Sequence, residues 1–466
     1  SRRAKELMAA GRFADAIPVY EKLVQAMPGN PGLRLNLAMA LHMAGADAKA
    51  IPQFEAVLKQ QPGALPALML LGASHLRTGH PAKAVPLLEK ALTLAPEDKE
   101  GRSMLADALL MLDRYEAAIP HLRKLAAAEP ANPRTWYGLG RCHEAAAQRA
   151  FEALEKLGPD SPWWLALAAE ARLKQGRHTA AFALYRAALE KQPNLRGAHA
   201  GLAEVYRNTQ HADWAAAEDQ REQSLGAPAC ATSTPECHFL KGRYEQALAA
   251  ARLKKTLEGF YWQSRAANEL ARDAFSRLTQ LPPSPQSHQV MAELYRNQGR
   301  HADSIAQWKA AQKLAPDDPR LALELATSVY LSRDYPAAER LARVLLAKDS
   351  SLSELHFILG DSLLNQQQPE QALAPLKKAV SLRQDYTEAH AVLGRALMLT
   401  GEAGPAIPHL KAALPVDADG SLYFQLSRAY QSVGQPALAA EALKKYQEIR
   451  KAGESTEVAI TAPPPH

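Results

Sequence analysis

The chain has 466 residues, of which 47% are hydrophobic and only 6% aromatic, and its 55 basic and 49 acidic side chains give a net charge of +6 at pH 7. No apolar stretch approaches the roughly 20 residues that a membrane-spanning helix requires. The positive excess is small for so long a chain, and phosphate-binding proteins usually gather their basic residues into one stripe. These numbers exclude a transmembrane helix and disfavour nucleic acid as a partner.

A period of 34 residues runs through the first part of the chain. Small residues recur at this spacing, and each is followed by Ile or Val and then by Pro: Ala16, Ala50, Ala84 and Ala118. A further proline follows each of these alanines after twelve residues: Pro28, Pro62, Pro96 and Pro130. A fixed period of roughly 20–50 residues is typical of stacked supersecondary units that contact only their neighbours. We therefore predict a first array of four repeats over residues 1–135.

Each repeat has the pattern of a hairpin of two helices. When the alanine above is counted as position 20, position 7 is large and apolar and position 8 is small, as in Leu71-Gly72. Small residues at positions 8 and 20 let two helices approach closely, while large ones at 7, 11 and 24 fill the space beside them. Glycine at position 15, as at Gly45 and Gly79, predicts the turn. We place the proline that follows position 20 in the first turn of the second helix, where it removes no hydrogen bond.

Two segments in the middle of the chain depart from this period and are similar to each other. At an offset of 124 residues the following pairs coincide: Tyr137 with Tyr261, Arg141 with Arg265, Ala147 with Ala271, and Phe151 with Phe275. Neither segment has the Gly-containing turn, so we predict that each forms one long helix or a tight hairpin. Such modules change the curvature of a stack of repeats, and we interpret them as joints. They define two further regions: 136–225, with two ordinary repeats, and 241–285, with a repeat-like hairpin.

Residues 226–240, between these two regions, are predicted to form a loop, because their Pro, Ser, Thr and small residues have no helical period. Two of the three cysteines, Cys230 and Cys237, lie here. A haem attachment motif would need a cysteine in place of Thr234, and a zinc site would need two ligands besides these residues and His238. We therefore expect neither a cofactor nor a metal. Two interpretations stay open: a disulfide in an exported protein, which we favour, and two free thiols in a cytosolic one.

The 34-residue period returns towards the C-terminus. Its small residues are Ser304, Ala338, Ala372, Ala406 and, one residue early, Ala439. This pattern predicts a second array of five repeats over residues 286–452. The last segment, residues 453–466, carries three consecutive prolines and no helical period, which favours an extended tail.

Together with Trp136, Leu139, Gly140 and the closing Pro130 or Pro193, these recurring residues resemble the tetratricopeptide repeat of bacterial proteins. The resemblance covers nearly the whole chain. It implies an all-α fold, a right-handed α-solenoid of helix hairpins, with the two turn-less modules as exceptions. It also implies that the first helices line a concave groove and that the second helices form the outer face.

Helical geometry places positions 2, 5, 9, 12 and 13 of each first helix on one face, which we take as the groove wall. Two repeats carry the same polar trio there: Glu204, Arg207 and Asn208, and Glu293, Arg296 and Asn297. Such residues would hydrogen-bond a bound peptide, or the Glu and Arg would pair with each other in solvent; both interpretations stay open. A more apolar continuation of the wall, suited to the apolar anchors of a partner, is expected at Phe357, Asp361, Asn365, Arg395, Met398, Phe424, Arg428 and Gln431.

The sequence contains no recognisable catalytic motif: it lacks a phosphate-binding Gly-rich loop, G-x-S-x-G and H-E-x-x-H. We therefore predict a non-enzymatic scaffold that binds protein partners along the groove, as an accessory subunit of a larger bacterial envelope-associated assembly. The pair Cys230 and Cys237 favours a periplasmic or extracellular location over the cytoplasm. Two alternatives stay open: an RNA-binding repeat protein, supported only by a pI of about 9.0, and the repeat half of a larger enzyme.

Overall fold

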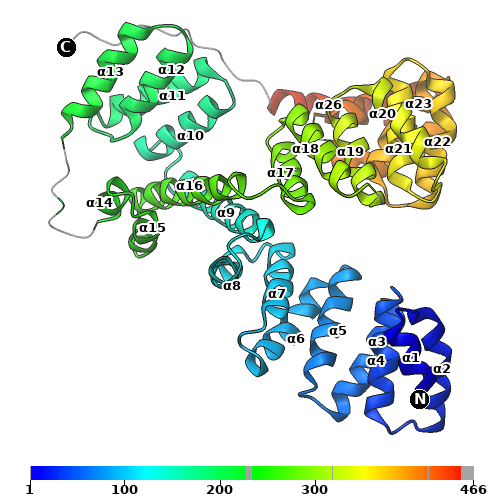
Figure 1. Cartoon of the computed structure of the whole chain (residues 1–466). Coiled ribbons are helices and arrows are strands. Elements are labelled where there is room, and N and C mark those ends of the chain that lie inside the picture. Colours follow the sequence, from blue (N-terminus) through cyan, green and yellow to red (C-terminus); the bar gives the residue numbers. More distant parts are fainter. Residues whose placement is uncertain (1, 227–229, 231–233, 317, 418, 453–466) are drawn as a thin grey trace. The chain divides into compact units, whose positions relative to one another are not determined.

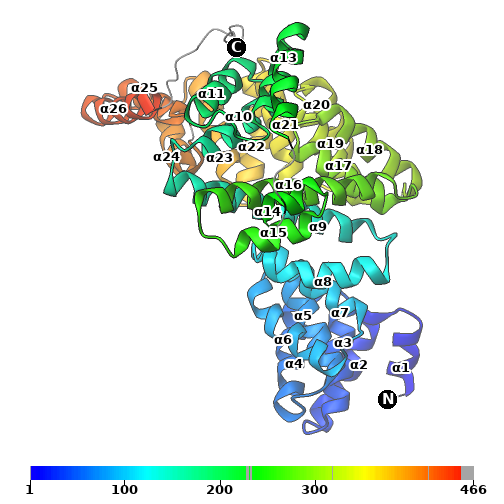
Figure 2. The same cartoon turned by 90° about the vertical axis from the view of Figure 1, so that its left-hand side faces the viewer.

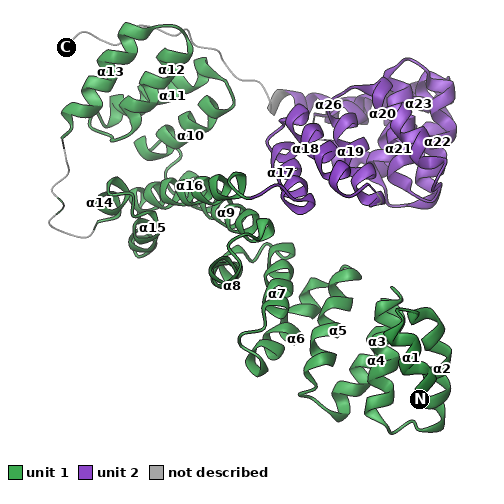
Figure 3. Ribbon diagram, in the orientation of Figure 1, with its two compact units in different colours: residues 1–281, 458–466 green, residues 282–457 purple. Residues whose placement is uncertain are grey.

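The computed structural model describes residues 2–226, 230, 234–316, 318–417 and 419–452 (Figure 1). Within these ranges the chain forms 26 α-helices and one short 3-10 helix, and it contains no strand. None of the described helices is long and apolar enough to cross a membrane. The chain divides between Leu281 and Pro282 into two compact units, unit 1 before this point and unit 2 after it (Figure 3). The predicted all-α solenoid is confirmed.

Unit 1 begins with four helix hairpins. Their helices are α1 (Arg2–Ala9), α2 (Phe13–Ala26), α3 (Pro31–Met43), α4 (Asp47–Gln60), α5 (Leu65–Arg77), α6 (Pro81–Leu94), α7 (Lys99–Met111) and α8 (Tyr115–Ala128). The proline after position 20 does not lie in the first turn of the second helix, so that prediction was wrong. Pro52 is the sixth residue of α4, where it removes the hydrogen bond that would reach back to the carbonyl group of Ala48.

Each hairpin turns at a residue with left-handed backbone geometry. At Gly11, Gly45 and Gly79 the φ angles are +70°, +78° and +74°. Four later repeats place a residue other than glycine at this position: Asp113, Gln210, Arg333 and Gln367, with φ between +55° and +65°. The turn therefore requires this conformation whether or not the sequence supplies glycine, the residue that adopts it at least cost.

The close approach of the two helices of a hairpin depends on position 8. A Cβ atom on Gly72 would lie 2.8 Å from the side chain of Leu88, and one on Gly394 would lie 2.7 Å from that of Leu410. Both leucines occupy position 24 of their repeats and are fully buried. The leucine of the second helix thus lies over the small residue of the first, and a larger residue at position 8 would separate the helices.

Position 4 of the first helix ties neighbouring repeats together, a feature that the sequence analysis did not identify. In six repeats its side chain bonds the backbone carbonyl group six residues earlier, in the turn between repeats. The bonds join Arg34 to Pro28 (3.1 Å), Trp136 to Pro130 (2.8 Å), His199 to Pro193 (2.9 Å), His356 to Ser350 (3.1 Å) and His390 to Gln384 (3.0 Å), and Arg102 bonds Pro96 in the same way. Arg, Trp and His have no common pattern in sequence, but all can donate an N–H group.

The two turn-less modules are single long helices, α9 (Pro133–Leu157) and α16 (Leu257–Thr279), which lie side by side (Figures 1 and 2). Gly140 of α9 lies directly against the ring of Phe275 of α16. Ala147 clusters with Ala266 and Ala267 in the same interface. Small residues therefore allow two similar helices to pack closely, although more than a hundred residues separate them in sequence.

The helices between these two are α10 (Pro162–Lys174), α11 (His178–Lys191), α12 (Ala198–Asn208), α13 (Ala212–Ser224), α14 (Pro235–Leu240) and α15 (Tyr244–Arg252). Helix α14 occupies the last six residues of the loop predicted over residues 226–240, so that part of the prediction was wrong; residues 227–229 and 231–233 lie outside the described residues. The hydroxyl group of Thr234 accepts a hydrogen bond from the backbone N–H of Cys237 (3.2 Å) and caps α14. Pro235 follows at the first helical position, where proline is favoured.

Unit 2 contains five further hairpins. Their helices are α17 (Pro285–Asn297), α18 (His301–Leu314), α19 (Pro319–Leu331), α20 (Tyr335–Leu346), α21 (Ser353–Asn365), α22 (Pro369–Leu382), α23 (Thr387–Leu399), α24 (Ala403–Ala413), α25 (Ser421–Ser432) and α26 (Pro436–Ala452), and the 3-10 helix spans Leu414–Val416. One continuous apolar core runs through these repeats. The tail predicted at residues 453–466 lies outside the described residues.

Candidate protein-binding surfaces

A buried carboxylate links three consecutive first helices of unit 2. Asp361 of α21 accepts hydrogen bonds from the hydroxyl group of Tyr330 in α19 and from Nη2 of Arg395 in α23, both at 2.6 Å. Asn365 donates to the backbone carbonyl of Asp361 (2.8 Å). Burial is the main cause that raises the pKa of Tyr330, and the negative charge of Asp361 raises it further. Asp361, Asn365 and Arg395 are thus in contact, but Asp361 is only 5% exposed and its carboxylate is occupied, so its prediction as a partner-binding residue was wrong. Its bonds stabilise the stacking of α19, α21 and α23.

Phe357 is not an exposed anchor, so this part of the prediction was wrong. Its side chain is 9% exposed and belongs to the core of unit 2. The rings of Tyr330 and Tyr386, at centroid distances of 5.7 and 5.1 Å, enclose it from both sides. Both tyrosines come from neighbouring repeats, so spacing within one repeat could not reveal that they cover Phe357.

The exposed part of the wall lies on α23 and α25, which are neighbouring first helices. Phe424 is 41% exposed and contacts the ring of Tyr446 at 5.3 Å. Met398 is half-buried, and Arg428 and Gln431 are exposed. Leu399, at position 13 of α23, is 63% exposed; the position rule includes it, although the sequence analysis did not name it. We call Arg395, Met398, Leu399, Phe424, Arg428 and Gln431 the C-terminal wall.

The two polar trios have different surroundings, and they lie in different units. In unit 1, Arg207 bonds Glu204 (2.9 Å) and also Asp219 of α13 (2.8 Å), with all three side chains well exposed. Glu204 and Arg207 therefore form the ion pair within one helix that the sequence analysis gave as the alternative to peptide binding. Asn208, the next residue, is exposed. Ion pairs this exposed contribute little stability.

In unit 2 the arginine of the trio, Arg296, pairs with an acidic residue of the next repeat. Arg296 bonds Glu324 of α19 at 2.5 Å and lies over the ring of Trp308. Glu293 of the same trio is half-buried, and Asn297 is exposed. The shared sequence A-E-[VL]-Y-R-N therefore does not define a shared binding arrangement: Arg207 pairs within its own helix and with Asp219 of α13, whereas Arg296 pairs with Glu324 of α19.

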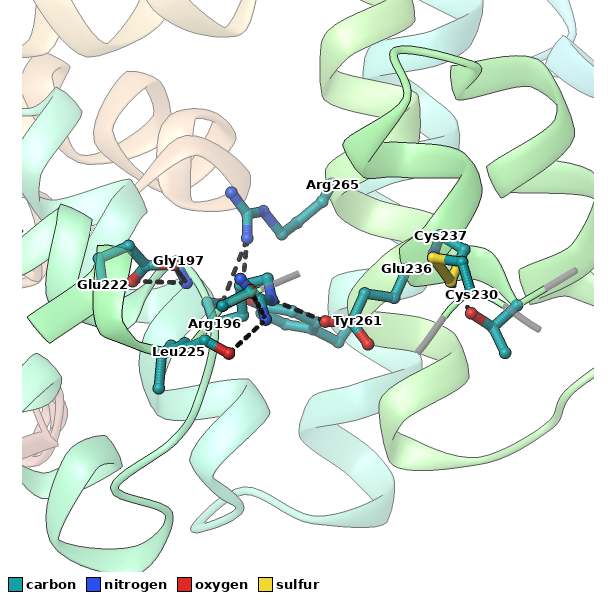
Figure 4. A network of polar contacts seen from close by, with 11 residues as sticks. Arg196, Gly197, Glu222, Leu225, Cys230, Glu236, Cys237, Tyr261 and Arg265 are labelled. Atoms are coloured by element: carbon teal, nitrogen blue, oxygen red, sulfur yellow. Dashed lines mark hydrogen bonds and ion pairs between the residues drawn. A yellow bond between two sulfur atoms is a disulfide. The ribbon is translucent and has the colours of Figure 1, made fainter. Parts of the chain in front are cut away.

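The turn before α12 is held by several polar contacts, shown in Figure 4. Arg196 pairs with Glu236 of α14 (2.8 Å) and donates to the backbone carbonyl of Gly226 (2.9 Å). The hydroxyl of Tyr261 in α16 donates to the backbone carbonyl of Arg196 (2.9 Å). The neighbouring Arg265 lies over aromatic rings of the same helix and bonds the hydroxyl of Tyr261 (3.1 Å). Helix α16 thus anchors the turn between α11 and α12.

Cys230 and Cys237 are joined by a disulfide, with their Cα atoms 5.6 Å apart (Figure 4). Cys237 follows Glu236 directly, so the bridge closes the chain beside the Arg196 contacts. Cys142, in α9, is a buried free thiol, and burial raises its pKa to about 12. Among the described residues, no group of three or more His, Cys, Asp or Glu side chains is placed to hold a metal ion.

One Ser/His/Asp cluster occurs in unit 1, but its geometry does not fit a hydrolase. The carboxylate of Asp47 and the hydroxyl of Ser74 both lie 2.8 Å from the same ring nitrogen of His42, Nδ1. A catalytic triad needs them on opposite nitrogens. Ser74 is also fully buried, and Arg77 pairs with Asp47 at 2.6 Å. Burial opposes ionisation of Asp47, but hydrogen bonds from Arg77, Ser74 and His42 outweigh it and lower its pKa. The cluster therefore joins two repeats.

Comparisons with solved structures give similar proteins at low identity. A MamA protein is 20% identical, with a TM-score of 0.31 over 38% of this chain and 97% of that one. YrrB, described as a TPR protein with an unusual peptide-binding site, is 21% identical, with a TM-score of 0.31 over 36% and 87%. TTC0263 of Thermus thermophilus, a thermophilic TPR protein, is 22% identical, with a TM-score of 0.30 over 36% and 93%. Comparison with curated proteins gives no match.

Family profiles described as tetratricopeptide repeat match most of the chain. The matched residues are 7–73 for one profile, 48–99, 69–133, 103–146, 145–195, 290–353 and 359–421 for a second, and 420–452 for a third. These ranges include the hairpins with the 34-residue period in both units. The chain belongs to the tetratricopeptide repeat family.

Proposed function

We propose that this scaffold binds a segment of a protein partner along the C-terminal wall, and that it does so without catalysis. The observation that carries the proposal is the exposure of two large apolar side chains, Leu399 and Phe424, on neighbouring first helices. Single exposed apolar residues are ordinary on protein surfaces. Here two exposed apolar side chains lie on adjacent helices of one wall, beside the half-buried Met398. They form a surface that the apolar anchor residues of a partner can contact.

The charges of the wall define the partner further. Arg395 is neutralised by Asp361, whereas Arg428 makes no ion pair with any described residue. Arginine binds carboxylates through a planar set of N–H donors. We infer that the partner segment carries apolar side chains and at least one acidic residue, which would lie beside Arg428.

The test starts with capture of partners by the full chain from its native source, followed by synthesis of the acidic, apolar segments of the captured proteins. Peptide affinities are then compared between the wild type and the variants Leu399→Asp and Arg428→Glu. We expect each variant to weaken binding about tenfold or more, since each removes a contact and adds a repulsive charge. Val344→Asp is the matched control, because Val344 is exposed on the second helix α20. Equal losses in all three variants would refute the assignment of the wall.

The second part of the proposal concerns location. Disulfides persist in secreted and periplasmic proteins and are rare in the cytosol, so the bridge between Cys230 and Cys237 supports export, as expected for a subunit of an envelope-associated assembly. Alkylation of the denatured protein, taken from its native source without reductant, tests this. We expect modification of Cys142 only. Modification of all three cysteines would place the protein in a reducing compartment.

A further inference from the structure

Unit 1 contains a pocket of about 730 Å³ that the family assignment does not explain. It lies where the two long helices α9 and α16 meet α10 and the start of α8. Its volume is in the range of small-molecule and side-chain pockets, roughly 300–1,000 Å³. Apolar side chains, including Phe151 and Leu167, form part of the lining, and the rest is polar.

Two polar groups of α16 face this pocket without a partner. Ser264 is 4% exposed, and its hydroxyl group makes no hydrogen bond to any described residue. The amide group of Asn268, one turn further along, is likewise unpaired within the described chain. Asn268 is half-buried. Both groups line the pocket with hydrogen-bonding capacity that the described residues leave unused, so they are available to a group that enters it.

The third group is the carboxylate of Glu144 on α9. Its nearest cation, Nε of Arg141, is 3.8 Å away, whereas the other charged pairs around the pocket are closer. Lys174 lies 2.8 Å from Glu170, and Arg149 lies 2.9 Å from Glu116. Desolvation raises the pKa of Glu144, which Arg141 only partly offsets. A second cation close to Glu144 would stabilise its charge.

The internal sequence similarity brings these groups together. Glu144 and Asn268 are 124 residues apart, the offset that relates α9 to α16, so they occupy equivalent positions on two similar helices. The same correspondence holds for the Tyr-Arg pairs beside them. Arg141 donates to the hydroxyl of Tyr137 (3.3 Å), and Arg265 donates to that of Tyr261 (3.1 Å). The pocket thus forms where two related helices pack together, and one pair of equivalent positions on them carries Glu144 and Asn268.

We propose that this pocket binds an alkylammonium group, with Glu144 as its counter-ion and with the oxygens of Ser264 and Asn268 as further hydrogen-bond acceptors. An ammonium group has three N–H donors and no acceptor, and one carboxylate, one hydroxyl and one amide oxygen satisfy all three. The alkyl chain would lie against Phe151 and Leu167. The ammonium belongs either to a lysine side chain of a protein partner or to a free amine. This site is in unit 1 and is independent of the C-terminal wall in unit 2.

Calorimetric titration of the full chain at low ionic strength tests the proposal. The probes are N-acetyl-lysine methylamide and n-butylamine, with the neutral N-acetyl-norleucine methylamide as the control ligand. We expect both amines to bind and the norleucine derivative to bind at least about tenfold more weakly. Glu144→Gln should weaken amine binding about tenfold, because a hydrogen bond to a charged group is replaced by one to a neutral amide. Glu155→Gln is the matched control, since Glu155 is exposed on the same helix and does not line the pocket.

A second variant keeps the test independent of Glu144. Asn268→Ala, checked for folding by circular dichroism, should weaken amine binding severalfold. Tighter binding of the lysine derivative than of n-butylamine identifies a partner side chain as the ligand, and the reverse order identifies a free amine. Binding of the norleucine derivative as tightly as the amines would overturn the proposal. So would unchanged amine affinity in both Glu144→Gln and Asn268→Ala.

Discussion

Replacing Asp361 by Ala should loosen the first helices of unit 2 locally. The substitution removes the hydrogen bond from Tyr330 to a charged acceptor, which contributes about 1.5–3 kcal/mol. It also removes the ion pair with Arg395, whose side chain is 40% exposed, so solvent screening limits that contribution to about 0.5–1 kcal/mol. The sum is about 3 kcal/mol, which corresponds to a change of roughly a hundredfold in the equilibrium between closed and open forms.

Native-state hydrogen exchange suits this prediction, because an array of repeats opens segment by segment and need not unfold in one step. We expect backbone amides of α19, α21 and α23 to exchange roughly a hundredfold faster in Asp361→Ala, while those of α3 and α5 keep their rates. Asp385→Ala is the control, since Asp385 is an exposed acid between α22 and α23. If Asp361→Ala changed exchange by less than about fivefold, the carboxylate would not hold the three helices together, and the reasoning would fail.

Three further predictions concern the turns, a buried histidine and the corrected anchor. Gly45→Ala should destabilise its repeat by about 1 kcal/mol. Backbone strain alone causes this loss, because no atom lies within 4 Å of the added Cβ. Gln367→Gly, at the same turn position, should stabilise its repeat by a few tenths of a kcal/mol, and thermal denaturation of both variants tests the two predictions. Desolvation, reinforced by nearby arginines, lowers the pKa of His143 to about 4. The unfolded chain therefore binds the proton more readily, and His143 should contribute a loss of about 3 kcal/mol of stability as the pH falls from about 6.5 to 4. His143→Phe should remove this contribution from the pH dependence measured by urea titration, while His42, His75 and His121, whose pKa values are also lowered, keep theirs. Phe357→Ala should cost about 3–5 kcal/mol by leaving a cavity, and a loss of partner binding without any loss of stability would contradict its place in the core.

The candidate surfaces could be predicted only in part. The position rule for first helices brought Asp361, Asn365 and Arg395 into one cluster, and it also placed Arg428 on the exposed wall. It failed for Phe357 and Asp361, which are buried, because it describes one repeat at a time and the residues that cover them belong to neighbouring repeats. It also treated the two polar trios as equivalent, whereas Arg207 and Arg296 pair with acids on different helices.

The sequence by itself determined the hairpin and its repetition. A small residue at position 8, a leucine at position 24 and a turn at position 15 act within about 20 residues of each other, so their spacing is visible in the linear chain. The tertiary structure alone decided that α9 packs against α16, that Ser264, Asn268 and Glu144 share one pocket, and that Phe357 is covered. These contacts join different repeats or modules, and they depend on which side chains a neighbouring helix presents once the repeats have stacked.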